Sequence, residues 1–219
     1  MDKPGPLAYP PAMPELPEVE TTVRGLARIL EGAVLARVET RREGLRRPFP
    51  ADLVQVLTGA QVTGLGRRAK YGLVHTSRGQ TMVFHLGMSG RWRIEPEELG
   101  VHDHLVLETE AGQRLALCDP RRFGSVDLLA SDSLDQWPQF AALGPEPLGE
   151  DLSAACLKAA LAGRSASIKL MLLDQRIVAG LGNIYVCEAL FRAGNDPRKA
   201  AGRVSGAALA RLVPAIRAV

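Results

Sequence analysis

A series of short runs rich in Val, Leu and Thr follows one after another through the first 130 residues, with glycines or charged turns between them. The runs lie near residues 33–40, 60–66, 71–77, 80–86, 104–109, 113–118 and 125–130. Runs of this length and composition predict β-strands. Many short strands in close succession are typical of a β-sandwich or a β-barrel.

One helix is expected before the first of these strands. Apolar residues recur at helical spacing from Glu18 to Leu30, and Gly32 stands where a left-handed helix cap is expected. Pro14 and Pro17 precede this segment, and prolines there can simply pre-set the first turn of a helix.

The strand pattern ends between residues 131 and 149, where prolines and glycines crowd a short span. Helices are predicted beyond it, near residues 151–162, 167–175, 184–193 and 205–217, and Pro214 weakens the last of them. We therefore expect a flexible extension over residues 1–12, a β-sandwich domain over 13–135, a linker over 136–150 and a helical domain over 151–219.

Composition narrows the class of protein. Of the 219 residues, 46% are hydrophobic, which is enough for a packed core. No apolar run approaches the roughly 18 residues that cross a bilayer, and no secretion signal opens the chain, so a cytoplasmic protein without a membrane partner is expected.

Charge is unevenly distributed along the chain. The formal net charge is +3, yet residues 151–219 hold ten Lys or Arg against four Asp or Glu, which leaves residues 1–150 with a net negative charge. A basic helical part can attract DNA phosphates, although it can equally be an ordinary solvated basic face.

Cysteines and histidines give little sign of a metal site. Cys118, Cys156 and Cys187 lie far apart, and the sequence contains no Cys-x-x-Cys. His102 and His104 form a His-x-His pair without a third ligand nearby, and with the other two histidines, His75 and His85, we expect them to be structural.

The octet Met-Pro-Glu-Leu-Pro-Glu-Val-Glu, residues 13–20, offers a chemical alternative to a simple helix start. If the chain began at Pro14, that residue would carry a free secondary amine with Glu15 as its neighbour. An amine can attack an electrophilic carbon and hold the product as an iminium, and a carboxyl group beside it can transfer the protons.

Five motifs in this order resemble the formamidopyrimidine-DNA glycosylase family. They are the octet, Arg67-Arg68-Ala69-Lys70-Tyr71, His85-Leu86-Gly87-Met88-Ser89-Gly90, Asp119-Pro120-Arg121-Arg122-Phe123-Gly124 and Gly180-Leu181-Gly182-Asn183-Ile184-Tyr185. The resemblance implies an α+β fold, with an N-terminal helix and a two-layered β-sandwich followed by a helical domain that contains a helix-two-turn-helix element.

The resemblance also implies an activity and a partner. It implies a bifunctional DNA glycosylase and abasic-site lyase that excises oxidised purines, such as 8-oxoguanine and formamidopyrimidines, from double-stranded DNA in the bacterial nucleoid. Pro14 would attack the sugar, Glu15 would manage protons, and β,δ-elimination would nick the strand. Lys70 matches a family lysine that contacts the damaged nucleotide and its phosphate, although by residue type alone it would be an ordinary surface lysine.

Further residues match the family's grip on DNA. Met88, Arg121 and Phe123 match the residues that fill the gap left by a flipped nucleotide, although a Met and a Phe more often belong to a core. Lys169 and Asn183 match residues that hold the DNA backbone, while Asn183 could instead be the N-cap of the next helix.

Two departures from the family pattern leave the activity open. Residues 1–12 would block the amine of Pro14, so a mistaken start or a proteolytic trim is expected, and an untrimmed chain could be a catalytically silent binder of damaged or abasic DNA. The family's zinc finger has no counterpart before the chain stops at Val219, so no cofactor is expected in this chain.

A third alternative, an endonuclease VIII-like enzyme for oxidised pyrimidines, fits less well because those enzymes carry glycine where this chain has Leu16. A monomer is expected.

Overall fold

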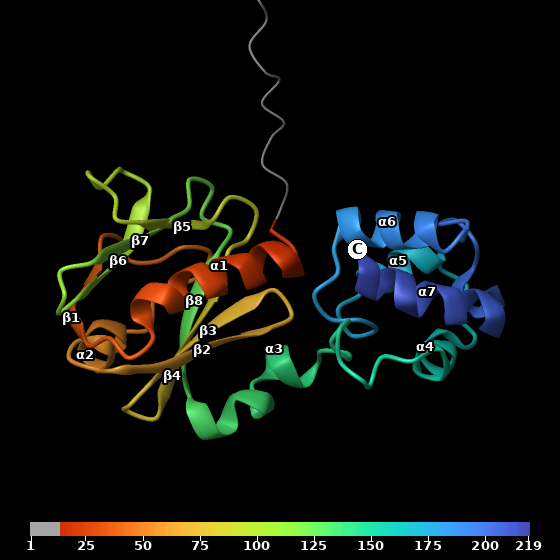
Figure 1. The fold of residues 1–219 in the computed structure, drawn as a ribbon, viewed down its shortest axis with the longest axis horizontal. Helices are drawn as coiled ribbons and strands as arrows, with labels where there is room; N and C mark the ends of the chain where they lie inside the picture. The colour runs from red at the N-terminus through yellow and green to blue at the C-terminus, as the bar shows by residue number, and fades with distance from the viewer. Residues whose placement is uncertain (1–13) are drawn as a thin grey trace, which may run out of the picture. The chain divides into compact units, whose positions relative to one another are not determined.

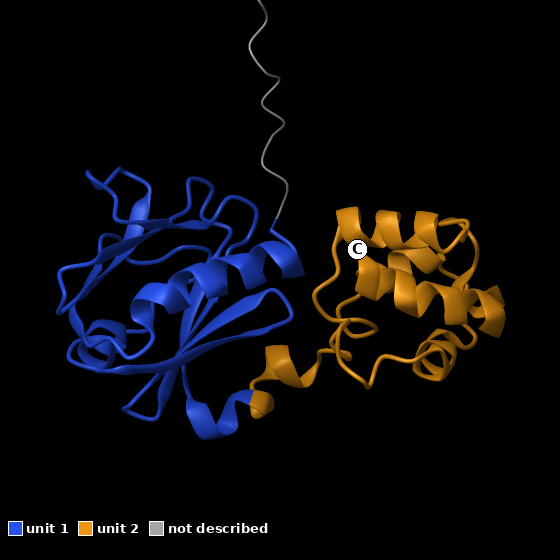
Figure 2. Cartoon of the chain, viewed as in Figure 1, with its two compact units in different colours: residues 1–134 blue, residues 135–219 orange. Residues whose placement is uncertain are grey.

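The computed structural model describes residues 14–219, and the expected extension over residues 1–12 lies outside them. The chain divides into two compact units at the boundary between Leu134 and Asp135 (Figure 2). The predicted linker over residues 136–150 belongs to the second unit and contains a short helix, α3 (Pro138–Ala141).

The first unit holds two four-stranded antiparallel sheets (Figure 1). One has the order β1 (Leu35–Thr40), β6 (Asp103–Thr109), β7 (Arg114–Cys118) and β5 (Arg91–Ile94), and the other has β2 (Val62–Arg68), β3 (Tyr71–Thr76), β4 (Gln80–His85) and β8 (Ser125–Ala130). The fold is thus the α+β arrangement that the sequence predicted, and the sandwich rather than the barrel is confirmed.

Strand β5 was not predicted. Its sequence, Arg-Trp-Arg-Ile, has an arginine at every second position and does not have the composition of a predicted strand. It forms because it pairs with β7 at the edge of the first sheet, with Trp92 opposite Leu117.

Helix α1 (Leu16–Leu30) carries the amphipathic pattern that the sequence predicted. Its buried stripe is Leu16, Val19, Val23, Leu26 and Leu30. The helix begins earlier than expected because Glu15 is its N-cap and forms a capping box with Glu18. Gly32 has φ +80°, which confirms the left-handed cap after the helix.

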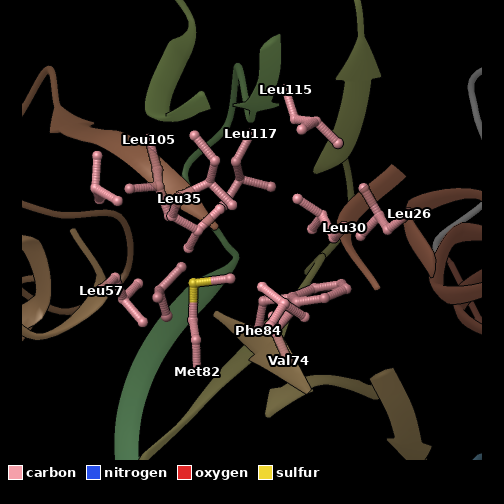
Figure 3. Close-up of a cluster of buried hydrophobic side chains, with 14 of the residues drawn as sticks. Leu26, Leu30, Leu35, Leu57, Val74, Met82, Phe84, Leu105, Leu115 and Leu117 are labelled. Atoms are coloured by element: carbon pink, nitrogen blue, oxygen red, sulfur yellow. The ribbon is translucent and has the colours of Figure 1, made fainter. Parts of the chain in front are cut away.

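The core of the first unit lies between the two sheets (Figure 3). In Figure 3, Leu105, Leu115 and Leu117 come from the first sheet, and Val74, Met82 and Phe84 face them from the second. Helix α1 and the unpredicted helix α2 (Leu53–Leu57) complete this core. Helix α2 is too short for a periodic signal, and only the pair Leu53 and Leu57 is buried in it.

The second unit consists of helices around its own apolar core. They are α4 (Ala154–Leu161), α5 (Ile168–Leu173), α6 (Asn183–Arg192) and α7 (Gly206–Ala218), with a short 3-10 helix, η2 (Ala201–Arg203); another, η1 (Ser131–Gln136), spans the boundary with the first unit. Serine side chains cap α4, α5 and α7 at Ser153, Ser167 and Ser205. The four predicted helices are present, and Pro214 lies within α7 without ending it.

Candidate functional site

The start of α1 and the tip of the β2–β3 hairpin form the first part of the site. Pro14 is half-buried, and Glu15 is 2% exposed. Lys70 follows Ala69 at the hairpin tip, and Ala69 is buried with φ +51°. The pKa of Lys70 lies below its ordinary value, because burial lowers it by more than the negative charges of Glu15 and Glu18 raise it. The structure therefore brings Lys70 within electrostatic reach of Glu15.

Arg67 fastens this hairpin to helix α1. Its Nε donates to Oε2 of Glu20 at 3.0 Å, and its Nη1 donates to the carbonyl oxygen of Ala69 at 2.8 Å. The guanidinium thus joins the helix that begins beside Pro14 to the turn that carries Lys70. The sequence motif contained Arg67, but its contact with Glu20 depends on tertiary packing.

Two loops present the predicted wedge residues. Met88 is 37% exposed and Phe123 is 46% exposed, and Arg121 lies over the Phe123 ring with its Cζ 4.7 Å from the ring centroid. An arginine on an aromatic face is a stabilising cation–π pair. Core packing, the alternative reading of Met88 and Phe123, is wrong because both side chains reach solvent.

Asp119 holds these two loops together. Its carboxylate is fully buried; Oδ1 accepts from the Ser89 hydroxyl at 2.6 Å, and Oδ2 accepts from the backbone N–H of Gly124 at 2.8 Å. The same hydroxyl accepts from the backbone N–H of Arg121 at 3.2 Å. Buried hydrogen bonds to a carboxylate are strong, so Asp119 fixes the wedge loops relative to each other.

A cavity of about 440 Å³ lies beside the wedge and is lined by Arg46, His85, Gly87, Met88 and Phe123. Burial, together with the positive charges of Lys70, Arg46 and Arg47, lowers the pKa of His85 to about 4. Because the N–H of Gly87 donates to Nδ1 of His85 at 3.0 Å, that nitrogen carries no proton. His85 was predicted to be structural, like the other three histidines, and its place in this cavity was not predicted. Its position directly before the Met88 loop was the available signal.

His85 should give the first unit a measurable acid sensitivity. The folded pKa lies below the ordinary value of 6.5, so between pH 6.5 and pH 4 the unfolded chain binds more protons. The free energy of unfolding should therefore decrease as pH falls through this window, by about 2 to 3 kcal/mol at pH 4.5. His85→Asn keeps an acceptor for the Gly87 N–H and removes the titration. Urea unfolding at pH 7.5 and 4.5 should show a smaller acid loss in the variant, and equal losses would contradict a depressed pKa.

In the second unit, two turns connect α5 to α6. Gln175 organises them: its Oε1 accepts from the N–H of Gly180 at 2.8 Å, and its Nε2 donates to the carbonyl oxygens of Leu173 and Leu181 at 3.1 and 2.8 Å. Gly180 itself has φ +82°. Gln175 was not among the predicted site residues, yet it holds these turns together as Asp119 holds the wedge loops together.

The two residues expected to hold the DNA backbone lie at helix starts in this unit. Lys169 is half-buried near the start of α5, and Asn183 is the exposed first residue of α6. The N-cap of α6 is Gly182, so the reading of Asn183 as the N-cap is wrong. Both residues thus lie at the positive end of a helix, where the helix dipole favours an anion.

Residues 14–219 contain no group of three or more His, Cys, Asp or Glu side chains that could hold a metal ion. Within the same residues, no helix is long and apolar enough to cross a membrane.

Comparison with known proteins places these sites in one family. The family model described as the formamidopyrimidine-DNA glycosylase N-terminal domain matches residues 13–126, and the model of the H2TH domain of the same glycosylases matches residues 143–219. The chain belongs to the formamidopyrimidine-DNA glycosylase family. Members of the family are DNA-repair glycosylases, and the H2TH match covers the two turns that Gln175 organises.

Close bacterial relatives carry the same name. The chain is 68% identical over 207 residues to the formamidopyrimidine-DNA glycosylase of Novosphingobium aromaticivorans and 69% identical to that of Rhizorhabdus wittichii. In both comparisons the match covers 94% of this chain and 77% of the relative.

Solved structures of the Lactococcus lactis enzyme share the fold. Its complex with DNA that contains an oxidised pyrimidine has a TM-score of 0.86 at 32% identity, covering 93% of this chain and 77% of that one. Its non-covalent complex with abasic-site DNA has a TM-score of 0.84 at 31% identity, covering 93% and 78%. A complex with N7-benzyl-Fapy-dG DNA has a TM-score of 0.86.

Proposed function

We propose that this chain excises oxidised purines from double-stranded DNA and nicks the resulting abasic site, with Pro14 as the attacking amine. One observation carries the proposal. Lys70 lies within electrostatic reach of both Glu15, beside Pro14, and His85, which lines the cavity next to Met88 and Phe123. In this proposal the flipped nucleotide reaches from this cavity to the start of α1, where Pro14 supplies an amine and Glu15 a carboxylate, and Lys70 supplies an ammonium.

The chemistry follows from those groups. The lone pair of a free Pro14 nitrogen forms a bond to C1′ of the flipped sugar, and the bond from C1′ to the damaged base breaks with its electron pair. The departing base takes up the proton that the Pro14 nitrogen loses, so the nitrogen regains a lone pair. Glu15 donates a proton to the sugar ring oxygen, the ring opens, and an iminium links Pro14 to C1′. Loss of a proton from C2′ then expels the 3′ phosphate, and a second elimination expels the 5′ phosphate. Lys70 acts as a fixed positive charge on a neighbouring phosphate.

The remaining residues take up the DNA around that nucleotide. Met88 and Phe123 replace the lost stacking, and Arg121 hydrogen-bonds the orphaned opposite base. Asn183 and Lys169, near the starts of α6 and α5, hold backbone phosphates. In this proposal the protein is a monomer, and this chain holds no cofactor. It acts in the cytoplasm, on the DNA of the nucleoid.

An excision panel tests the proposal against its two alternatives. Duplexes that contain 8-oxoguanine, a formamidopyrimidine, an oxidised pyrimidine or a preformed abasic site are incubated with the chain beginning at Pro14, and strand cleavage is measured. Cleavage at the purine lesions and the abasic site is expected. Preferential cleavage at the pyrimidine would favour an endonuclease VIII-like enzyme, and tight binding without cleavage would favour a silent binder.

Phe123→Ala should separate nucleotide flipping from chemistry. Unstacking costs a few kcal/mol, so loss of the ring should slow excision from paired duplex by about 10- to 100-fold. Cleavage at a preformed abasic site, where less stacking is lost, should change far less. Phe191→Ala is a matched control because it removes an exposed ring on α6 outside the proposed site. If Phe123→Ala lowers the melting temperature strongly and both activities fall together, Phe123 is a structural residue.

A further inference from the structure

A second cavity, of about 580 Å³, lies between the loop of residues 41–48 and Arg122 in the first unit. We call it the arginine pocket. Its lining is Arg41, Arg42, Glu43, Gly44, Leu45, Arg46, Arg47, Pro48 and Arg122. Five guanidinium groups and a single carboxylate therefore surround one hollow, although residues 1–150 as a whole carry net negative charge.

Two of the five arginines have partners within the unit. Arg47 forms an ion pair with Asp127 at 2.6 Å. Arg41 donates to the carbonyl oxygens of Gly100 and Asp103 at 2.7 and 3.2 Å. Their charges are partly committed to the protein.

The other three arginines differ from these two in their partners. Among residues 14–219, no carboxylate lies within ion-pairing distance of Arg42, Arg46 or Arg122, and their side chains donate no hydrogen bond within the protein. Like charges gathered at one hollow repel each other, so an anion that entered it would be attracted by all three.

The pocket is a built feature of the fold. Backbone N–H groups of Leu45 and Phe49 donate to the carbonyl oxygens of Arg47 and Glu43 at 3.0 and 2.9 Å, which closes the loop on itself. The N–H of Arg46 donates to the carbonyl oxygen of Gly124 at 3.1 Å, which ties the loop to the Phe123 segment. The backbone of the loop is therefore fixed before a ligand arrives, which lowers the entropy cost of binding.

Arg122 reaches the pocket through an unusual backbone. Its φ is +59°, a left-handed conformation that costs about 1 kcal/mol or more in a residue with a side chain. In this conformation Arg122 lines the arginine pocket, while Arg121, its neighbour, lies over Phe123 in the wedge. The two adjacent arginines thus serve two different places.

Arg46 connects the arginine pocket to the candidate site, because it lines both this pocket and the cavity that holds His85, Met88 and Phe123. We propose that Arg42, Arg46 and Arg122 hold a backbone phosphate of the duplex, close to the step at which Met88 and Phe123 enter the stack. This inference rests on the proposed function, and it adds a phosphate grip within the first unit to the contacts of Lys169 and Asn183 in the second.

The first test is the salt dependence of binding to a duplex with an abasic-site analogue, measured with the whole chain. Each lost phosphate contact reduces the steepness of log Kd against log salt by about one unit. Arg46→Gln should do so and weaken binding about 5- to 20-fold at moderate salt. Arg37→Gln is the matched control, because Arg37 is an exposed arginine of the same unit that pairs with Glu39 on strand β1.

The second test locates the phosphate. Phosphates of the duplex are replaced one at a time by neutral methylphosphonates, and each duplex is bound to wild type and to Arg46→Gln. At the phosphate that Arg46 holds, neutralising the phosphate and removing the guanidinium should weaken binding no more together than singly. Additive effects at every phosphate would overturn the proposal. It would also be overturned if Arg46→Gln bound the duplex as wild type does and lost only its sensitivity to competing inorganic triphosphate. The pocket would then be a site for free phosphate compounds.

A pair of substitutions at Arg122 separates its charge from its backbone. Arg122→Gly removes the guanidinium and suits a positive φ, whereas Arg122→Gln removes it and keeps the strain. Equal losses of affinity in both variants support the phosphate contact; full affinity in either one overturns it. Wild-type binding and excision are measured in parallel, so a wild type that neither binds nor cuts damaged DNA would count against the proposed function itself.

Discussion

A chain that begins at Pro14 is expected to excise 8-oxoguanine and nick the strand, whereas the same chain with residues 1–13 attached binds the duplex without cutting it. In an internal peptide bond the nitrogen of Pro14 shares its lone pair with the carbonyl group and cannot attack C1′. Loss of a nucleophile typically costs several orders of magnitude in rate, so we expect a difference of at least about 1,000-fold in single-turnover excision.

Borohydride trapping gives the decisive readout. It should link the trimmed chain, but not the untrimmed one, covalently to DNA through the reduced iminium, with both masses confirmed by mass spectrometry. Pro14→Gly retains a primary amine and should keep some lyase activity. Glu15→Gln should lose base excision more than elimination at an abasic site, because protonation of the sugar assists the first step most. Efficient trapping by the untrimmed chain would contradict the proline mechanism. It would indicate a lysine as the attacking amine, with Lys70 as the first candidate.

Gly87→Ala is expected to disable excision while the protein stays folded. Gly87 has φ +62°, and a Cβ there would lie 2.4 Å from the carbonyl carbon of Phe123 and 2.6 Å from the nitrogen of Gly124. Since backbone atoms cannot give way as a side chain can, the Met88 and Phe123 loops must move apart. A displacement of about 1 Å in a positioned group can cost about 100-fold in rate, and we expect a loss of that order from paired duplex.

The matched control is Gly79→Ala. Gly79 has φ +68°, but a Cβ there meets nothing within 4 Å. Both variants therefore carry the same backbone strain, roughly 1 kcal/mol, and only Gly87→Ala forces the wedge loops apart. Excision and melting temperature are measured for both. A similar loss of excision in the two variants would mean that general strain, rather than the fit between the loops, is responsible.

The elements that the sequence predicted well are those with long, regular patterns. The apolar stripe of α1, the strands of the first unit other than β5 and the four helices α4 to α7 of the second unit depend on residues that are neighbours along the chain. Strand β5 and helix α2 were not predicted, because β5 carries arginines at alternate positions and α2 buries only two leucines. Each exists because of what it packs against.

The candidate residues divide in a similar way. Pro14, Glu15, Lys70, Met88, Arg121, Phe123, Lys169 and Asn183 came from the resemblance of their local motifs, and their functional roles remain predictions. The partners that position them did not follow from those motifs: Asp119 bridges Ser89 and Gly124, and Gln175 ties Gly180 to Leu181.

Motif chemistry and the succession of strands and helices were already present in the amino-acid sequence, because they depend on residue type and on spacing along the chain. The low pKa of His85 and the arginine pocket came from the folded chain alone. A pKa depends on burial and on which charges lie nearby, and the pocket requires residues 41–48 to meet Arg122. Such encounters are set by long-range packing of the two sheets, which leaves no mark in the local sequence pattern.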